Sequence, residues 1–151
     1  MRVAVAADHA GYPIKDIVLD VVRDAGHEAI DLGTYSLESV DYPDYAEKLG
    51  TAIQQGQADR GILVCGSGIG ACVAANKMHG IYASICHDTY SAAQGVEHDD
   101  LNVLCMGARV IGIEVAKAVV KAFLGASFST EERHRRRVAK VHAIEERNSS
   151  Q

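Results

Sequence analysis

The sequence predicts an α/β fold: a mostly parallel sheet with helices on both faces. Short apolar, β-branched runs alternate with longer segments of helical period, which is the pattern of successive β-α-β units. A chain of 151 residues can bury one substantial core and is too short for two ordinary domains in series. We therefore expect a single domain over residues 1–151.

Five short segments have the apolar, β-branched composition of buried parallel strands. The expected strands are Arg2–Ala6, Glu28–Leu32, Gly61–Cys65, Tyr82–Cys86 and Val103–Met106.

Helices are expected between these strands. In the first, a broad apolar stripe runs from Ile14 to Val22, Pro13 suits the first turn and Gly26 suits the stop. The other crossovers are expected at Asp44–Gln55, Ile69–Met78, Ser91–His98 and Ile113–Leu124. A final charged helix is expected over about Thr130–Arg147. Its apolar stripe is narrow, so we expect it to pack partly against a second subunit.

The composition excludes several classes of protein. Hydrophobic residues make up 48% of the chain and charged residues 23%, as in folded globular proteins. The net charge of -5 gives no general attraction for nucleic acids. The cysteines form no CxxC pair and no Cys/His spacing typical of zinc, so we expect no metal site. We expect a cytoplasmic protein with reduced thiols, because no segment has the pattern of a signal peptide or a membrane span.

Ligands of open α/β sheets bind beyond the carboxyl ends of the strands, so the residues that follow the strands are the candidates for function. After the first strand, Asp8 and His9 place a carboxylate and an imidazole at the start of a helix. This pair suits proton transfer or phosphate binding. The alternative is that Asp8 only caps the helix and His9 is a solvated loop residue.

The third strand leads into Cys65-Gly66-Ser67-Gly68-Ile69-Gly70, a loop whose backbone N–H groups can surround an oxyanion or a phosphate. A thiol near a helix N-terminus ionises more readily, so Cys65 is a candidate base or nucleophile, and Ser67 can donate its hydroxyl. The alternative is a buried cysteine beside a tight strand-to-helix turn. The stretch also fits the dinucleotide pattern G-x-G-x-x-A, with Asp88 in the place of the ribose-binding acid, so a nucleotide-binding module is a rival interpretation.

A third set of polar residues is dispersed. His98 and Asp99 precede the fifth strand and Arg109 follows it. Arg133 and Arg137 are four residues apart on the last helix, so both guanidinium groups lie on one face and could bind a phosphate. The alternative is a solvated, charged helix face.

Several of these motifs occur in a characteristic order. They are Asp8-His9-Ala10-Gly11, Asp41-Tyr42-Pro43, Cys65 to Gly70, Ala74-Ala75-Asn76-Lys77, Asn102-Val103-Leu104 and Gly107-Ala108-Arg109. Together, and over nearly the whole chain, they resemble the type B ribose-5-phosphate isomerases and their galactose-6-phosphate isomerase relatives. The resemblance implies a three-layer α/β/α sandwich around a five-stranded parallel, Rossmann-like sheet. It also implies a homodimer, or a tetramer, with active sites at the subunit interface.

The resemblance implies a reaction and a role for each residue. An aldose phosphate and a ketose phosphate are interconverted through an enediolate, without metal or organic cofactor. Cys65 matches the base, His98 the acid that opens the sugar ring, and Ser67 and Asp8 other catalytic groups. The implied substrate-binding residues are His9, Tyr42, Gly66, Gly68, Ile69, Gly70, Asp99, Arg109, Arg133 and Arg137.

Two positions in this sequence bear on the branch and the substrate. One branch of the family has a glutamate as its base, at the position of Ala71, so the resemblance is to the branch that uses the cysteine. Asp99 stands where several members have asparagine, and a carboxylate cannot donate to sugar hydroxyls unless it is protonated. We expect ribose 5-phosphate as substrate, with galactose 6-phosphate, allose 6-phosphate or a tetrulose phosphate as alternatives.

Overall fold

The computed structural model describes residues 1–149, in which strands and helices alternate until the last two helices. In chain order the elements are β1 (Arg2–Ala7), α1 (Tyr12–Asp24), β2 (Glu28–Asp31), α2 (Tyr42–Gln54), β3 (Arg60–Cys65), α3 (Ile69–Ala75), β4 (Ala83–Ile85), α4 (Thr89–Asp99), β5 (Val103–Gly107), α5 (Ile113–Gly125) and α6 (Glu132–Ser149).

The strands form one parallel sheet in the order β2-β1-β3-β5-β4. In its centre Val5 of β1 is paired with Ile62 of β3, and Ile62 is paired with Leu104 of β5. These strands are buried on both faces, as their continuous apolar runs predict. The expected five-stranded parallel sheet is confirmed.

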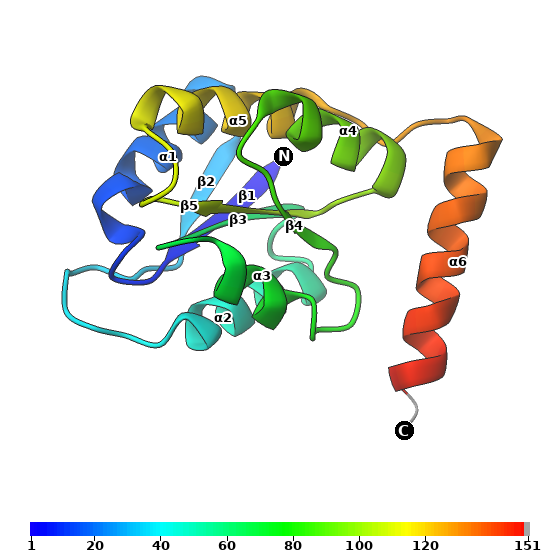
Figure 1. Ribbon diagram of the computed structural model, residues 1–151, viewed down its shortest axis with the longest axis horizontal. Helices are drawn as coiled ribbons and strands as arrows, with labels where there is room; N and C mark the ends of the chain where they lie inside the picture. The colour runs from blue at the N-terminus through cyan, green and yellow to red at the C-terminus, as the bar shows by residue number, and fades with distance from the viewer. Residues whose placement is uncertain (150–151) are drawn as a thin grey trace.

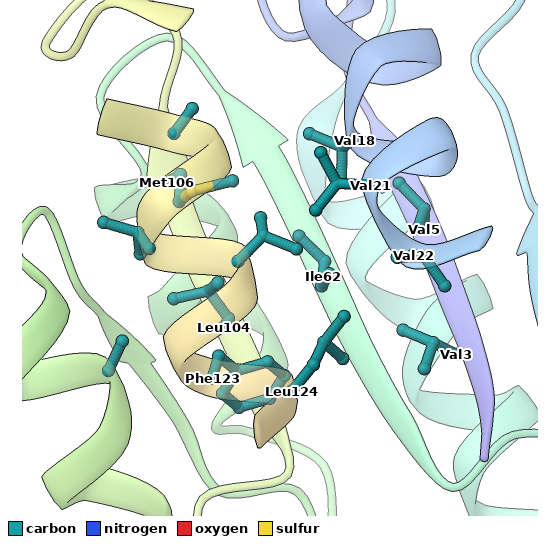
Figure 2. Packing of buried hydrophobic residues seen from close by; sticks show 14 of the residues in the cluster. Val3, Val5, Val18, Val21, Val22, Ile62, Leu104, Met106, Phe123 and Leu124 are labelled. Atoms are coloured by element: carbon teal, nitrogen blue, oxygen red, sulfur yellow. The ribbon is translucent and has the colours of Figure 1, made fainter. Parts of the chain in front are cut away.

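Helices cover both faces and complete the predicted three-layer sandwich (Figure 1). Helices α1, α4 and α5 pack on one face, where Val18 and Phe123 are almost fully buried against Ile62 and its neighbours (Figure 2). Helices α2 and α3 pack on the other face, where Leu49 and Ala71 belong to the cluster around Leu63. Because β-strand side chains alternate between faces, each central strand contributes to both cores.

The helix boundaries differ from the prediction at two places that matter for the site. Helix α2 begins at Tyr42 instead of Asp44, since Pro43 is tolerated in a first helical turn. Helix α3 ends at Ala75 instead of Met78. There the Asn76 side chain donates to the Ala83 carbonyl and accepts from the Ala83 N–H, both at 2.8 Å, so it pairs with the edge strand β4 as another strand would.

Helix α6 stands beside α4, on the side of the domain away from α1 (Figure 1). Val138 is buried, whereas Val141 and Ile144 are 50% and 53% exposed. Glu145 attaches the helix to the domain by accepting from the Tyr82 hydroxyl at 2.6 Å and from the Gly80 N–H at 3.1 Å. Among residues 1–149 there is no helix with the length and apolar content needed to span a bilayer.

Candidate active site

The candidate site lies at the carboxyl ends of the three adjacent central strands β1, β3 and β5. The chain leaves β1 and β5 toward helices on one face of the sheet, and leaves β3 toward α3 on the other. The connections therefore diverge and leave a crevice at this edge, as is usual for ligand sites in open α/β sheets.

The β1 connection supplies a buried carboxylate and a fixed imidazole. Asp8 is 8% exposed, and its Oδ1 accepts from the N–H groups of Ala10 and Gly11 at 2.9 and 3.0 Å. These two bonds hold the turn that precedes α1, whereas the N-cap of the helix is Gly11 and has no side-chain cap, so the alternative that Asp8 caps the helix is wrong. The Nδ1 atom of His9 accepts from the Val40 N–H at 3.1 Å, so the ring proton of the neutral imidazole is on Nε2, which can donate to an anion.

The β3 connection supplies the thiol. Cys65 is 5% exposed, and its sulfur accepts from the Gly68 N–H at 3.0 Å, which fixes the side chain at the floor of the crevice. Gly68 has a φ of 84°, a left-handed conformation that glycine adopts without strain, and this lets the loop return over the sulfur. Ser67 is exposed, and its Oγ accepts from the Ile69 N–H at 3.2 Å, which leaves the hydroxyl proton for a ligand.

Two side chains from other elements flank this loop. The Tyr42 ring lies so close to Gly70 that a Cβ on this glycine would be 2.6 Å from Tyr42 Cζ. The Arg109 side chain packs over Gly66, where a Cβ would be 3.6 Å from Arg109 Nη1. The arginine is exposed, and its backbone N–H donates to the Gly66 carbonyl at 3.0 Å, which links the β5 connection to the glycine-rich loop.

A cavity of about 380 Å³ joins these groups. Its lining consists of Asp8, His9, Ala10, Tyr42, Cys65, Gly66, Ser67, Gly70, Arg109 and Val110. The structure therefore brings together eight of the residues that the sequence singled out. Gly68 and Ile69 belong to the same loop without lining the cavity.

The remaining candidates form a second group between α4 and α6. The His98 ring stacks on the His134 ring with 4.0 Å between their centroids, and Gln94 Nε2 lies 3.0 Å from His98 Nδ1. Another cavity, of about 550 Å³, is lined in part by His98, Arg133 and His134. Arg133 is paired with Glu131.

Asp99 and Arg137 complete this second group as exposed residues. None of His98, Asp99, Arg133 and Arg137 lines the cavity at Cys65, within the part of the chain that the structure describes. One chain alone thus holds the predicted site residues on two separate surfaces.

His134 is 4% exposed, and its Nδ1 has no hydrogen-bond partner among residues 1–149. Burial lowers the pKa of His134, and the neighbouring His98, Arg133 and Arg137 lower it further, against an opposite effect of Asp99. His134 lies on α6 and not after a strand, so the rule that ligands bind beyond strand ends does not identify it.

Four other histidines, His27, His79, His87 and His142, were interpreted as exposed loop or helix residues without a function, and of these only His79 is exposed. His87 is half-buried, and its Nε2 accepts from the Gly107 N–H at 2.9 Å. It is the second residue after β4, so a search of the residues that follow the strands could have found it. His142 is half-buried, and its ring stacks on that of Tyr82.

The dinucleotide interpretation also loses its acidic residue. Asp88 is the N-cap of α4, and its carboxylate accepts from the Ser91 N–H at 2.6 Å. This accounts for an acid at that position without a ribose.

Comparisons with known proteins agree on one family. Residues 3–141 match the Ribose/Galactose Isomerase family. The chain is 43% identical to ribose-5-phosphate isomerase B of Escherichia coli over 148 residues, and this aligned region covers 98% of this chain and 99% of that protein. It is 42% identical to D-erythrulose-4-phosphate isomerase of Pectobacterium atrosepticum over 132 residues, which make up 85% of each chain.

Solved structures give the same result. The type B ribose 5-phosphate isomerase of Trypanosoma brucei superposes with a TM-score of 0.92 at 46% identity, over 95% of this chain and 97% of that one. Ribose-5-phosphate isomerase B of Clostridium thermocellum superposes with a TM-score of 0.94 at 42% identity, over 98% and 99%. The chain belongs to the ribose/galactose isomerase family.

Proposed function

We propose that this protein is a sugar-phosphate isomerase that interconverts ribose 5-phosphate and ribulose 5-phosphate. The observation that carries the proposal is the cavity in which Cys65 lies with the glycine-rich loop, Asp8 and Arg109. A base, anion-binding N–H groups and a cationic side chain are what an isomerisation through an enediolate requires at one place.

In the proposed reaction the Cys65 thiolate removes the proton from C2 of the open-chain aldose. The electron pair forms the C1–C2 double bond of an enediolate, and negative charge develops on O1. N–H groups of the loop and the Ser67 hydroxyl are proposed to stabilise this charge more than they stabilise the neutral carbonyl. A proton then passes from O2 to O1, for which Asp8 is the proposed relay, and return of the proton from the thiol to C1 gives the ketose.

The other cavity residues hold the substrate. His9 can donate from Nε2, since its Nδ1 accepts from the Val40 N–H, and Arg109 offers a planar guanidinium, so both suit the phosphate. Asp8 and Tyr42 are assigned to the sugar hydroxyls, with Asp8 Oδ2 as the acceptor. Phosphate binding far from the reacting carbons orients C1 and C2 toward the sulfur.

We further propose that a second copy of the chain supplies the other group of residues. In a homodimer, His98 of the partner would protonate the ring oxygen of the closed sugar, and Arg133 and Arg137 of the partner would bind the phosphate. The exposed Val141 and Ile144 on α6 support this assembly, because a helix that buries so little in its own domain gains stability from a partner. We place the enzyme in the cytoplasm, in pentose phosphate metabolism, with its thiols reduced.

Proton NMR of the pure protein with ribose 5-phosphate in deuterated buffer tests the reaction. Ribulose 5-phosphate should appear, and the recovered ribose 5-phosphate should carry deuterium at C2. Galactose 6-phosphate, allose 6-phosphate and a tetrulose phosphate are run in parallel. Turnover of one of these without turnover of the pentose would replace the proposed substrate, and no turnover of any would refute the proposed activity.

The base is tested with Cys65→Ala and Cys65→Ser. Both variants should lose turnover by at least about a thousandfold while they still bind inorganic phosphate, since the phosphate ligands are intact. A variant with nearly full activity would eliminate Cys65 as the base.

The shared site is tested by mixing two inactive variants, Cys65→Ala and His98→Ala. Subunit exchange should restore about a quarter of the activity of the unmutated enzyme, because half of the dimers are mixed and each mixed dimer has one complete site. Mixed dimers that form, as detected by native mass spectrometry, but stay inactive would place both residues in the same subunit's site.

A further inference from the structure

His87, a residue that the proposed mechanism does not use, is bonded to the end of β5. Strand β4 ends at Ile85, which is paired with Cys105, and continuing this register places His87 opposite Gly107, the last residue of β5. There the Gly107 N–H donates to Nε2 of the His87 ring at 2.9 Å. The half-buried imidazole thus supplies the acceptor for a backbone donor at the carboxyl edge of the sheet.

Gly107 lies in direct contact with the glycine-rich loop of the candidate site. A Cβ on this glycine would be 2.6 Å from the carbonyl carbon and oxygen of Ser67 and 2.8 Å from the Gly66 oxygen, so the two backbones are packed with no room for a side chain. Ser67 and Gly66 both line the Cys65 cavity. A displacement of the Gly107 backbone therefore moves this part of the loop.

Three consecutive N–H groups hold the chain where it leaves β5, and only the first depends on a side chain. The N–H groups of Ala108 and Arg109 donate to backbone carbonyls of the Cys65–Gly70 loop at 2.8 and 3.0 Å. These backbone acceptors are present whatever the side chains are, whereas the acceptor for Gly107 is the imidazole. A substitution at His87 can therefore remove one of the three bonds without removing the acceptors of the other two.

We propose that His87 is a positioning residue for the isomerase reaction, because through Gly107 it holds the glycine-rich loop in the geometry that stabilises the enediolate. This inference rests on the proposed function. Within the part of the chain that the structure describes, His87 does not line the Cys65 cavity, so it acts on the loop and not on the substrate. Loop N–H groups act on charge that develops in the transition state, so an error in their position lowers the rate of turnover more than it weakens substrate binding.

The residues assigned to the phosphate do not depend on this bond. His9 is held by the Val40 N–H, and the Arg109 backbone is held by the Gly66 carbonyl. Loss of the His87 acceptor should therefore reduce kcat about tenfold and change the dissociation constant of inorganic phosphate by less than about twofold. A general distortion of the site would instead weaken both turnover and phosphate binding.

The experiment compares single variants of the full-length protein by steady-state kinetics with ribose 5-phosphate and by calorimetric titration with inorganic phosphate. His87→Phe keeps a flat ring and removes the acceptor, so it should show the loss of kcat. His87→Gln places a carbonyl oxygen at the same number of bonds from Cβ as Nε2 of histidine, so kcat should stay within about twofold of the unmutated value. His27→Phe is the matched control, because His27 is also half-buried but lies before β2, at the opposite edge of the sheet, and its kcat should be unchanged.

The hydrogen bond itself is tested without turnover, by NMR measurement of amide hydrogen exchange. The Gly107 amide should exchange about tenfold faster in His87→Phe than in the unmutated protein, and His87→Gln should restore the slow exchange. The proposal is overturned if His87→Phe keeps full kcat, if His87→Phe and His87→Gln lose kcat equally, or if the Gly107 amide exchanges at the same rate in all of these proteins. If the unmutated protein turns over no sugar phosphate, the proposed function fails, and the Gly107 exchange rates still decide whether His87 holds the end of β5.

Discussion

Replacing Lys15 by methionine should destabilise the fold, because this lysine is buried in an ion pair. Lys15 is on α1 and is 2% exposed, with its ammonium 2.8 and 3.1 Å from the two carboxylate oxygens of Asp31 and 2.7 Å from the Thr34 carbonyl. The ring of Tyr35 lies 4.3 Å from the ammonium. All three ammonium protons are thus used, and the ion pair joins α1 to the end of β2.

The geometry sets the size of the effect. Loss of one partner of a fully buried ion pair costs about 3–5 kcal/mol, and loss of an exposed pair at most about 1 kcal/mol. The Asp31 side chain is 30% exposed and keeps a hydrogen bond from the Gly33 N–H, so water and the backbone compensate part of the loss. We therefore expect Lys15→Met to lower the free energy of unfolding by about 2–3 kcal/mol.

Urea unfolding followed by circular dichroism measures this difference, at equal protein concentrations because the proposed dimer would unfold in a concentration-dependent way. Lys48→Met is the matched control: this lysine is exposed and 5.8 Å from the Tyr45 ring centroid, so its loss should change stability by less than about 0.5 kcal/mol. The double variant with Asp31→Asn should lose less than the sum of the single losses. Equal effects of Lys15→Met and Lys48→Met would refute the reasoning.

Two further predictions concern the two surfaces of the site. Gly70→Ala should lower kcat/KM about tenfold, because the new methyl group displaces the Tyr42 ring, while Gly112→Ala, whose Cβ would meet no atom within 4 Å, should leave the kinetics unchanged. His134→Phe should make the free energy of unfolding less dependent on pH. Because the pKa of His134 is lowered in the folded protein, the unfolded chain binds a proton first as the pH falls. The unmutated protein therefore loses stability as the pH falls through about 6.5 and below, and the variant lacks this loss. Urea unfolding of variant and unmutated protein at pH 7.5 and 5.5 measures this difference. Equal decreases in the free energy of unfolding between the two pH values would contradict the prediction.

Much of the fold and about half of the site could be predicted because they depend on local patterns. The strands β1, β3 and β5 are nearly continuous apolar runs, and the residue after such a strand must lie at the carboxyl edge of the sheet. Asp8, Cys65 and Arg109 were found in this way.

The features that were missed depend on contacts between distant parts of the chain. Asn76 ends α3 because it pairs with Ala83 of an edge strand, which no helical period reveals. Lys15 appears in the sequence as a polar position within an amphipathic helix, and only its partner Asp31, sixteen residues away, explains its burial. The stacking of His98 on His134 likewise requires α6 to dock beside α4.

The division of the candidate site has a physical basis in the charge of its ligand. Among the described residues that line the Cys65 cavity, Arg109 is the only one with a permanent positive charge, and Asp8 brings a negative one. A phosphate dianion bound there needs further cations, and the chain carries Arg133 and Arg137 on a helix that its own domain buries only in part. Because α6 packs weakly in one chain, its exposed apolar side chains can be buried by a partner, and this burial would stabilise the dimer. Under the proposed assembly, dimerisation therefore stabilises α6 and completes the phosphate site in one step, so an isolated subunit would have the base without the charges that orient its substrate.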